Sequence, residues 1–153
     1  DIEYDWGGDS GTETPLGAAA HVGNAAIARY LIEQGAAITP AAAAMLGDQP
    51  ALDALIDLDP DNANQNGAHG IPLLAHAAFS GNPALLDHLV SRGTRLEGVS
   101  LAMLNAATSG HAAVVRWALE HWADPAAQNY QGKTAADLAR ENDFPDILAL
   151  FTE

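Results

Sequence analysis

The stretch T-P-L-G-A-A-A-H-V-G-N-A-A-I-A-R-Y-L-I-E-Q-G-A-A, residues 14–37, predicts two short helices joined by a tight turn. Thr14 is a favourable N-cap, and Pro15 stands at the first helical position, where its missing N–H costs nothing. Gly23 supplies the left-handed conformation that ends this helix, and Asn24 can cap the next one. A helix pair of this size cannot bury its own apolar face, so it requires neighbouring units.

The turn glycine recurs along the chain. It falls at Gly23, Gly47, Gly81 and Gly110, and Asp143 stands at the corresponding place near the C-terminus. The spacings are 24, 34, 29 and 33 residues, and two of them lie close to a single period. With the T-P-L start and the two short helices, a period of about 33 residues resembles the ankyrin repeat.

This resemblance implies an all-α ankyrin-repeat solenoid of about five antiparallel helix pairs with short hairpin-like loops, covering residues 13–153. The unit at residues 38–57 is degenerate, because A-A-A-A-M-L-G-D stands where the family has its conserved core. Residues 1–12 mix acidic residues and glycines with two aromatic residues, and we expect an N-terminal arm or cap there. The combinations G-A-A-A-H-V-G-N, A-A-A-M-L-G and H-G-I-P-L-L-A-H-A are also similar to a group of bacterial ankyrin-repeat proteins.

Two places depart from the family pattern. Residues 59–70 form the longest polar, turn-rich segment, with Asn66–Gly67 as a turn signal, and we expect a prominent finger there. Trp122 occupies the position of a helix-terminating glycine that normally takes a positive φ. A bulky side chain adopts that conformation at a cost of about 1–3 kcal/mol. Either Trp122 is strained or the turn is remodelled.

The composition excludes several classes of partner. The formal net charge is −14, from 20 acidic and 6 basic side chains. A surface of this charge repels nucleic-acid phosphates and anionic lipids. The chain has no cysteine, and no apolar run reaches the roughly 18 residues needed to cross a bilayer. We therefore expect a soluble, monomeric protein with no nucleic-acid or membrane partner.

The acidity and the location each leave two interpretations. The carboxylates are scattered along the chain, which favours an adaptation of the whole surface to solubility or high salt. A field that steers a basic partner is the alternative. The cytoplasm is favoured as the location, but the first residue is Asp1, so export followed by removal of a signal stays open.

Six histidines raise the question of metal binding or catalysis. The chain has no H-E-x-x-H motif, no histidine pair at i, i+4 on one helix and no G-x-S-x-G motif. We therefore expect no enzyme, no catalytic residue, no cofactor and no metal site. The resemblance implies a structural role for His111, which follows the turn glycine. We expect His76 in the core or between repeats and His69 on the surface.

The resemblance implies that a partner contacts the loop tips and the two residues before each turn glycine. Those pairs are His21 and Val22, Met45 and Leu46, Phe79 and Ser80, Thr108 and Ser109, and Glu141 and Asn142. The predicted function is a protein-binding module that uses the concave groove and the finger. The predicted contact residues are Val22, Met45, Leu46, Phe79, Asn66 and His69.

Three alternatives remain open from the sequence. Irregular geometry in the second repeat can place Met45 and Leu46 in the core, with Phe79 packed under the finger. A small-molecule or enzymatic site can lie between the finger and repeat three, with His76, His69 or His21 acting beside a carboxylate. A purely structural or self-associating unit would make a symmetric contact through the same apolar residues.

Overall fold

The computed structural model describes residues 13–152, and over this range the chain is a succession of short helices with no β-strand. The predicted arm at residues 1–12 lies outside the described residues. The α-helices are α1 (Pro15–His21), α2 (Ala25–Glu33), α3 (Pro40–Leu46), α4 (Gln49–Leu58), α5 (Leu73–Ala77), α6 (Pro83–Ser91), α7 (Val99–Ser109), α8 (Ala112–Glu120), α9 (Ala135–Glu141) and α10 (Pro145–Ala149). Four 3₁₀ segments join them: η1 (Pro60–Asn64), η2 (Ala68–Gly70), η3 (Ala78–Ser80) and η4 (Leu96–Gly98).

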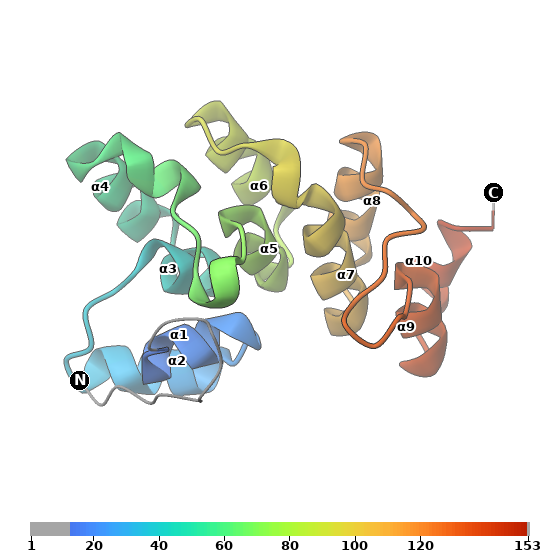
Figure 1. Ribbon diagram of the computed structural model, residues 1–153, viewed down its shortest axis with the longest axis horizontal. Helices are drawn as coiled ribbons and strands as arrows, with labels where there is room; N and C mark the ends of the chain where they lie inside the picture. Colours follow the sequence, from blue (N-terminus) through green and yellow to red (C-terminus); the bar gives the residue numbers. More distant parts are fainter. Residues whose placement is uncertain (1–12, 153) are drawn as a thin grey trace.

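The helices pair in chain order and stack into an elongated array. The first helices of successive units, α1, α3, α5, α7 and α9, pack one on the next. The second helices α4, α6 and α8 form a separate row along the upper edge of Figure 1, and the α1–α2 pair lies beneath α3 at the left. The predicted all-α solenoid is confirmed. Within residues 13–152, each helix is too short or too polar to span a bilayer.

Short polar side chains begin these helices as the sequence predicts. The Thr14 hydroxyl accepts a hydrogen bond from the Gly17 N–H at 3.0 Å, and the Asn24 side chain accepts one from the Ile27 N–H at 3.1 Å. Asp48 caps α4 in the same way. Each cap satisfies an N–H group that the first turn of a helix leaves without a partner.

The turn between the paired helices is left-handed in every unit. All five residues of the recurring pattern have a positive φ: Gly23 (71°), Gly47 (71°), Gly81 (70°), Gly110 (80°) and Asp143 (57°). Space also requires glycine at some of these turns. A Cβ at Gly23 would meet the Phe79 ring, and one at Gly81 would meet the His111 ring. Glycine recurs at these turns for two reasons: the backbone is left-handed there, and at Gly23 and Gly81 a ring from another unit leaves no room for a side chain.

His111 has the structural role that the resemblance implies. Its Nε2 atom lies 3.1 Å from the Phe79 carbonyl oxygen, while its ring covers Gly81. This contact links the fourth unit to the third, so His111 serves packing between repeats rather than chemistry.

The predicted projecting finger is wrong in its main feature, because residues 59–70 dock back onto the array. Asn64 donates from its amide to the Gly93 carbonyl at 2.9 Å and accepts from the Arg95 N–H at 2.8 Å. The Thr94 hydroxyl donates to the Ala63 carbonyl at 2.8 Å, and Ala63 is buried. These bonds hold η1 against the loop that follows α6.

The predicted Asn66–Gly67 turn is also wrong. Gly67 is extended, with φ −81° and ψ −161°, and the positive φ values occur instead at His69 (56°) and Gly70 (70°). A Cβ at Gly67 would collide with the imidazole of His76. The glycine therefore provides room for a side chain of another element, which a local turn rule cannot detect.

The buried apolar side chains of the described residues form two clusters. The N-terminal cluster, made by α1, α2 and α3, consists of Leu16, Ala19, Ala20, Ala28, Ala41, Ala42 and Met45. The main cluster runs from α3 to α10 and contains most of the leucine, valine and isoleucine side chains that are buried. The first unit is thus held largely by small side chains, while later units interlock through larger ones.

Candidate functional site: an uncharged groove and a histidine–carboxylate cluster

A groove of about 550 Å³ runs along the ends of the first helices. Its walls come from the end of α1, from η3, from α7, from α9 and from the loop before α9. The lining residues are His21, Val22, Ile71, Phe79, Leu101, Leu104, Asn105, Thr108, Gln128, Asn129, Tyr130, Gln131 and Leu138. The groove therefore joins units that are distant in sequence.

Among the described residues 13–152, the lining of this groove contains no aspartate, glutamate, lysine or arginine, although the chain carries a net charge of −14. Val22 is 66% exposed and Tyr130 is 94% exposed, and both are large apolar surfaces open to a partner. Asn105 is held by a hydrogen bond from its amide to the Ala75 carbonyl at 2.9 Å. The groove thus offers apolar contacts and neutral hydrogen-bonding groups.

The structure separates the predicted contact residues. Val22 and Phe79 line the groove, and Phe79 also packs against the N-terminal cluster. Met45, which the sequence predicts as a contact residue, is only 3% exposed and belongs to that cluster. Leu46 is partly buried and lines a different hollow, beside α2. For Met45, the core position left open from the sequence is the one observed.

Asn66 and His69 lie on the docked segment and are exposed, but neither lines the groove. Tyr130 is one of several groove residues that sequence reasoning missed. It stands in a loop fixed by Asn129, whose side chain accepts hydrogen bonds from the Gln131 and Lys133 N–H groups. The Asn-Tyr-Gln-Gly run of that loop was a usable signal, since loop tips are where the family resemblance places contacts.

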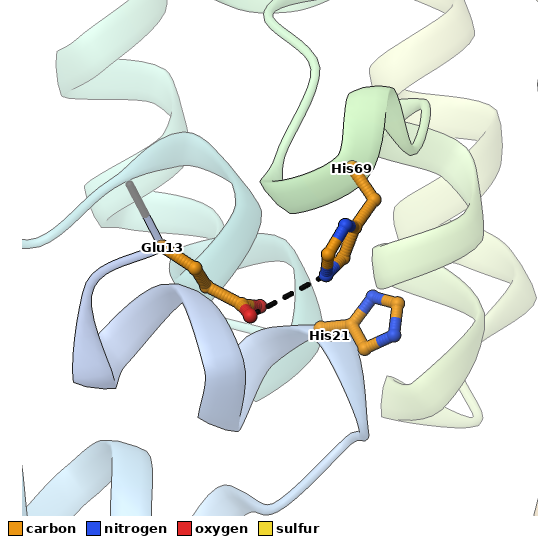
Figure 2. A group of neighbouring side chains, drawn as sticks. All are labelled: Glu13, His21 and His69. Atoms are coloured by element: carbon orange, nitrogen blue, oxygen red, sulfur yellow. Dashed lines mark ion pairs between the residues drawn. The ribbon is translucent and has the colours of Figure 1, made fainter. Parts of the chain in front are cut away.

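A second feature lies beside the groove, where Glu13, His21 and His69 converge (Figure 2). The His69 Nε2 atom lies 3.4 Å from Glu13 Oε2, and the His21 and His69 rings meet edge to face with centroids 4.9 Å apart. One ligand atom from each of the three side chains falls within 4.8 Å of the others. The sequence places Glu13 and His69 56 residues apart, so no local motif could indicate this cluster.

Local structure explains how these side chains meet. Glu13 directly precedes the Thr14 cap of α1, and His21 is the last residue of the same helix. His69 comes from η2, where its left-handed backbone turns its side chain toward α1. Contacts between α1 and η2 bring the two elements together.

Three buried polar atoms at this place have no hydrogen-bond partner among residues 13–152: Glu13 Oε1, His21 Nδ1 and His76 Nε2. His76 is 1% exposed, and its Nδ1 atom lies 3.2 Å from the Ala20 carbonyl. Burial lowers the pKa of His76, so the imidazole is neutral in the folded protein. His76 is thus the buried histidine between repeats that the sequence predicts.

Another histidine–carboxylate pair lies on the row of second helices. His88 Nε2 is 2.7 Å from Asp53 Oδ1, and Arg92 reaches both Asp53 and Asp57. The hydrogen bond from His88 lowers the pKa of Asp53, with the Arg92 charge adding to it. Such partly exposed pairs between neighbouring helices are ordinary surface ion pairs of modest energy.

Residues 13–41 match the family model of the ankyrin repeat. No curated protein matches the chain. Ankyrin repeats are generally protein–protein interaction modules, and the family is generally non-catalytic. The matched helix pair and its left-handed turn recur through the described structure, which has the all-α architecture of an ankyrin-repeat solenoid.

Proposed function

We propose that this chain is a non-catalytic protein-binding module that holds a segment of another protein in the groove. The observation that carries the proposal is the mixture of apolar and neutral polar side chains among the described lining residues of that groove, within a strongly acidic chain. A partner attracted only by charge would gain nothing from such a lining. A partner with apolar side chains and free backbone groups would gain contact area and hydrogen bonds.

Tyr130 and Val22 are the proposed centres of affinity. Their side chains are exposed in the free protein, so contact with a partner would remove apolar area from water. Tyrosine is also enriched among residues that dominate binding energy. Phe79 completes the apolar surface from η3, and the amides of Asn105 and Gln128 would set the orientation of the bound segment. Asn66 and His69 would contact only parts of the partner beyond the groove.

Within the part of the chain that the structure describes, the lining of the groove contains one histidine, His21, and no carboxylate. An acid–base pair inside the groove, which an enzymatic function would need, is therefore not supported by its lining. The proposal treats the chain as a monomer, and self-association through the groove is the competing outcome. Sedimentation of the wild type distinguishes the two, because a dimer held through Val22 would dissociate in a Val22→Ser variant.

The test is affinity capture from a lysate of the source organism with three matched proteins. Wild type should retain a specific partner, and Tyr130→Ala should lose most of it, since truncating a central contact residue typically costs about 2 kcal/mol or more. Tyr30→Ala is the matched control, because Tyr30 is 60% exposed on α2 and does not line the groove. Equal retention by wild type and Tyr130→Ala would refute the groove as the binding surface.

A further inference from the structure

We propose that Glu13, His21 and His69 bind a divalent transition-metal ion, and that Zn²⁺ is the ion best suited to them. This proposal is independent of the groove and of any protein partner. It rests on the geometry of the three side chains and on two buried atoms that lack hydrogen bonds.

The spacing of the ligand atoms fits such an ion. Zinc bonds to histidine nitrogen and carboxylate oxygen are about 2.0–2.1 Å long, so ligand atoms in a tetrahedral site lie about 3.3 Å apart. The Glu13 Oε2 to His69 Nε2 distance is 3.4 Å. Since all three ligand atoms lie within 4.8 Å of one another, a shift of at most about 1.5 Å in the His21 ring would complete the set.

Two buried polar atoms without hydrogen bonds also support a metal site at this cluster. Glu13 Oε1 and His21 Nδ1 are both buried and make no hydrogen bond to any residue that the structure describes. A buried polar group without a partner costs about 1–3 kcal/mol, and a charged one costs more. Such atoms are rare in native proteins, and an ion is one of the few partners that can satisfy them. Two of the three proposed ligands therefore carry an atom whose burial is otherwise unexplained.

The types of ligand favour zinc over the hard cations. Imidazole nitrogen suits Zn²⁺, Cu²⁺ and Ni²⁺, whereas Mg²⁺ and Ca²⁺ prefer oxygen ligands alone. Two histidines and one glutamate leave a fourth position for water, and His69, whose side chain is 45% exposed, faces the solvent from which the ion would enter. The net charge of −14 also raises the local concentration of cations.

The proposed ion would join two elements. Glu13 and His21 stand at the two ends of α1, and His69 belongs to η2 in the docked segment. Metal binding would therefore tie the first unit to the segment that precedes α5, and it should raise the melting temperature of the protein.

The experiment is a titration of chelator-treated protein with ZnCl₂, followed by calorimetry and by melting temperature. We expect one ion per chain, a higher melting temperature, and no comparable shift with MgCl₂ or CaCl₂. Glu13→Gln, His21→Asn and His69→Asn should each weaken zinc binding about tenfold or more, since loss of even an outer-shell partner costs 10–100-fold. Asparagine also tolerates the left-handed backbone at residue 69.

His88→Asn and His121→Asn are the matched controls, because each removes a histidine that lies near a carboxylate elsewhere on the surface. Both should bind zinc like the wild type. Zinc affinity that is unchanged in all three ligand variants, or that falls equally in the controls, would overturn the proposal.

A second measurement protects the test against variants that do not fold. In the wild-type protein, added zinc should shift the imidazole nitrogen resonances of His21 and His69 and leave those of His111 and His121 in place. Unshifted His21 and His69 resonances at saturating zinc would refute the site, whatever the variants do.

Discussion

Trp122 takes the conformation of the glycine that it replaces. Its φ is 65°, and its side chain is 83% exposed, so the ring gains little packing in return for the strained backbone. Of the two interpretations that the sequence leaves open, strain is the one observed. The equivalent positions at the ends of α2 and α6 are Gly35 and Gly93, with φ values of 98° and 101°.

Trp122→Gly should raise the free energy of unfolding by about 1 kcal/mol. Relief of a left-handed non-glycine residue is worth about 1–3 kcal/mol, and the greater freedom of glycine in the unfolded chain takes back about 0.4–1 kcal/mol. Chemical denaturation measures the change, and Trp122→Ala is the control, because it removes the ring but keeps the strain. A loss of 3–5 kcal/mol would mean that the ring packs as a core tryptophan does.

Gly67→Ala should destabilise the protein although its backbone is compatible with alanine. The added methyl group would collide with the His76 imidazole, and overpacking a buried site typically costs about 1–3 kcal/mol. Urea denaturation of the variant gives the cost. The same substitution in a His76→Ala background should cost much less, and an equal cost in both backgrounds would show that His76 is not the obstacle.

At single residues, a feature could be predicted from the sequence when its cause lies nearby in the chain, and not when the cause is a tertiary contact. The caps at Thr14 and Asn24 could be predicted, because each joins a side chain to a backbone N–H three residues further along the chain. Gly67 could not be understood in the same way, since the imidazole that requires it stands nine residues further along. The Asn66–Gly67 pair reads locally as a turn, and a tertiary contact decides otherwise.

At the scale of elements, helices with a proline near the N-terminus were predictable and the docked segment was not. Proline at the first or second position, with a polar cap before it, marks the start of α1, α3, α4 and α6. Residues 59–70 lack a hydrophobic period, so their polar composition suggests a projecting loop. Their partners at Gly93 and Arg95 lie about 30 residues away, beyond the reach of composition.

Helix α9 begins with a capping box whose stabilising contribution depends on pH. The Thr134 N–H and hydroxyl both donate to the Asp137 carboxylate, and they hold the pKa of Asp137 below its usual value. A carboxylate with a lowered folded-state pKa stabilises the protein above its unfolded pKa. That contribution is lost as the pH falls through about 4 and then through the folded pKa.

Asp137→Asn should therefore lower the melting temperature at pH 7, and the difference from wild type should shrink as the pH falls below about 4. Scanning calorimetry across this range makes the measurement. Glu120→Gln, at the exposed end of α8, is the control for a simple change of charge. A difference that grows with acidity would contradict the role of the capping box.

At the scale of the whole molecule, the repeat pattern revealed the solenoid but not the site. The recurring turn positions are visible in the sequence as four glycines and one aspartate, so the solenoid could be predicted from these five positions. The cluster of Glu13, His21 and His69 depends on α1 meeting η2 across the array. The lack of a histidine pair on one helix therefore does not exclude this cluster, because its side chains come from separate segments.

The acidic surface makes a prediction about salt. The chain has 20 acidic and 6 basic side chains. Folding brings the excess negative charges closer together, so their mutual repulsion destabilises the folded state. Raising NaCl from about 0.1 M to about 1 M shortens the Debye length from about 10 Å to about 3 Å and should raise the melting temperature. KCl should act equally. A flat response would argue against adaptation of the surface to high salt.

The contrast between the two buried clusters has a mechanical consequence. Small side chains gain less from burial than leucine or valine, and the N-terminal cluster is mostly alanine. Under tension applied at its two ends, the array should yield first at α1 and α2, at lower force than the units joined through the main cluster. An ion bound between α1 and η2 would act as a clasp at that weak end, and the first rupture event in a pulling experiment should then move to higher force.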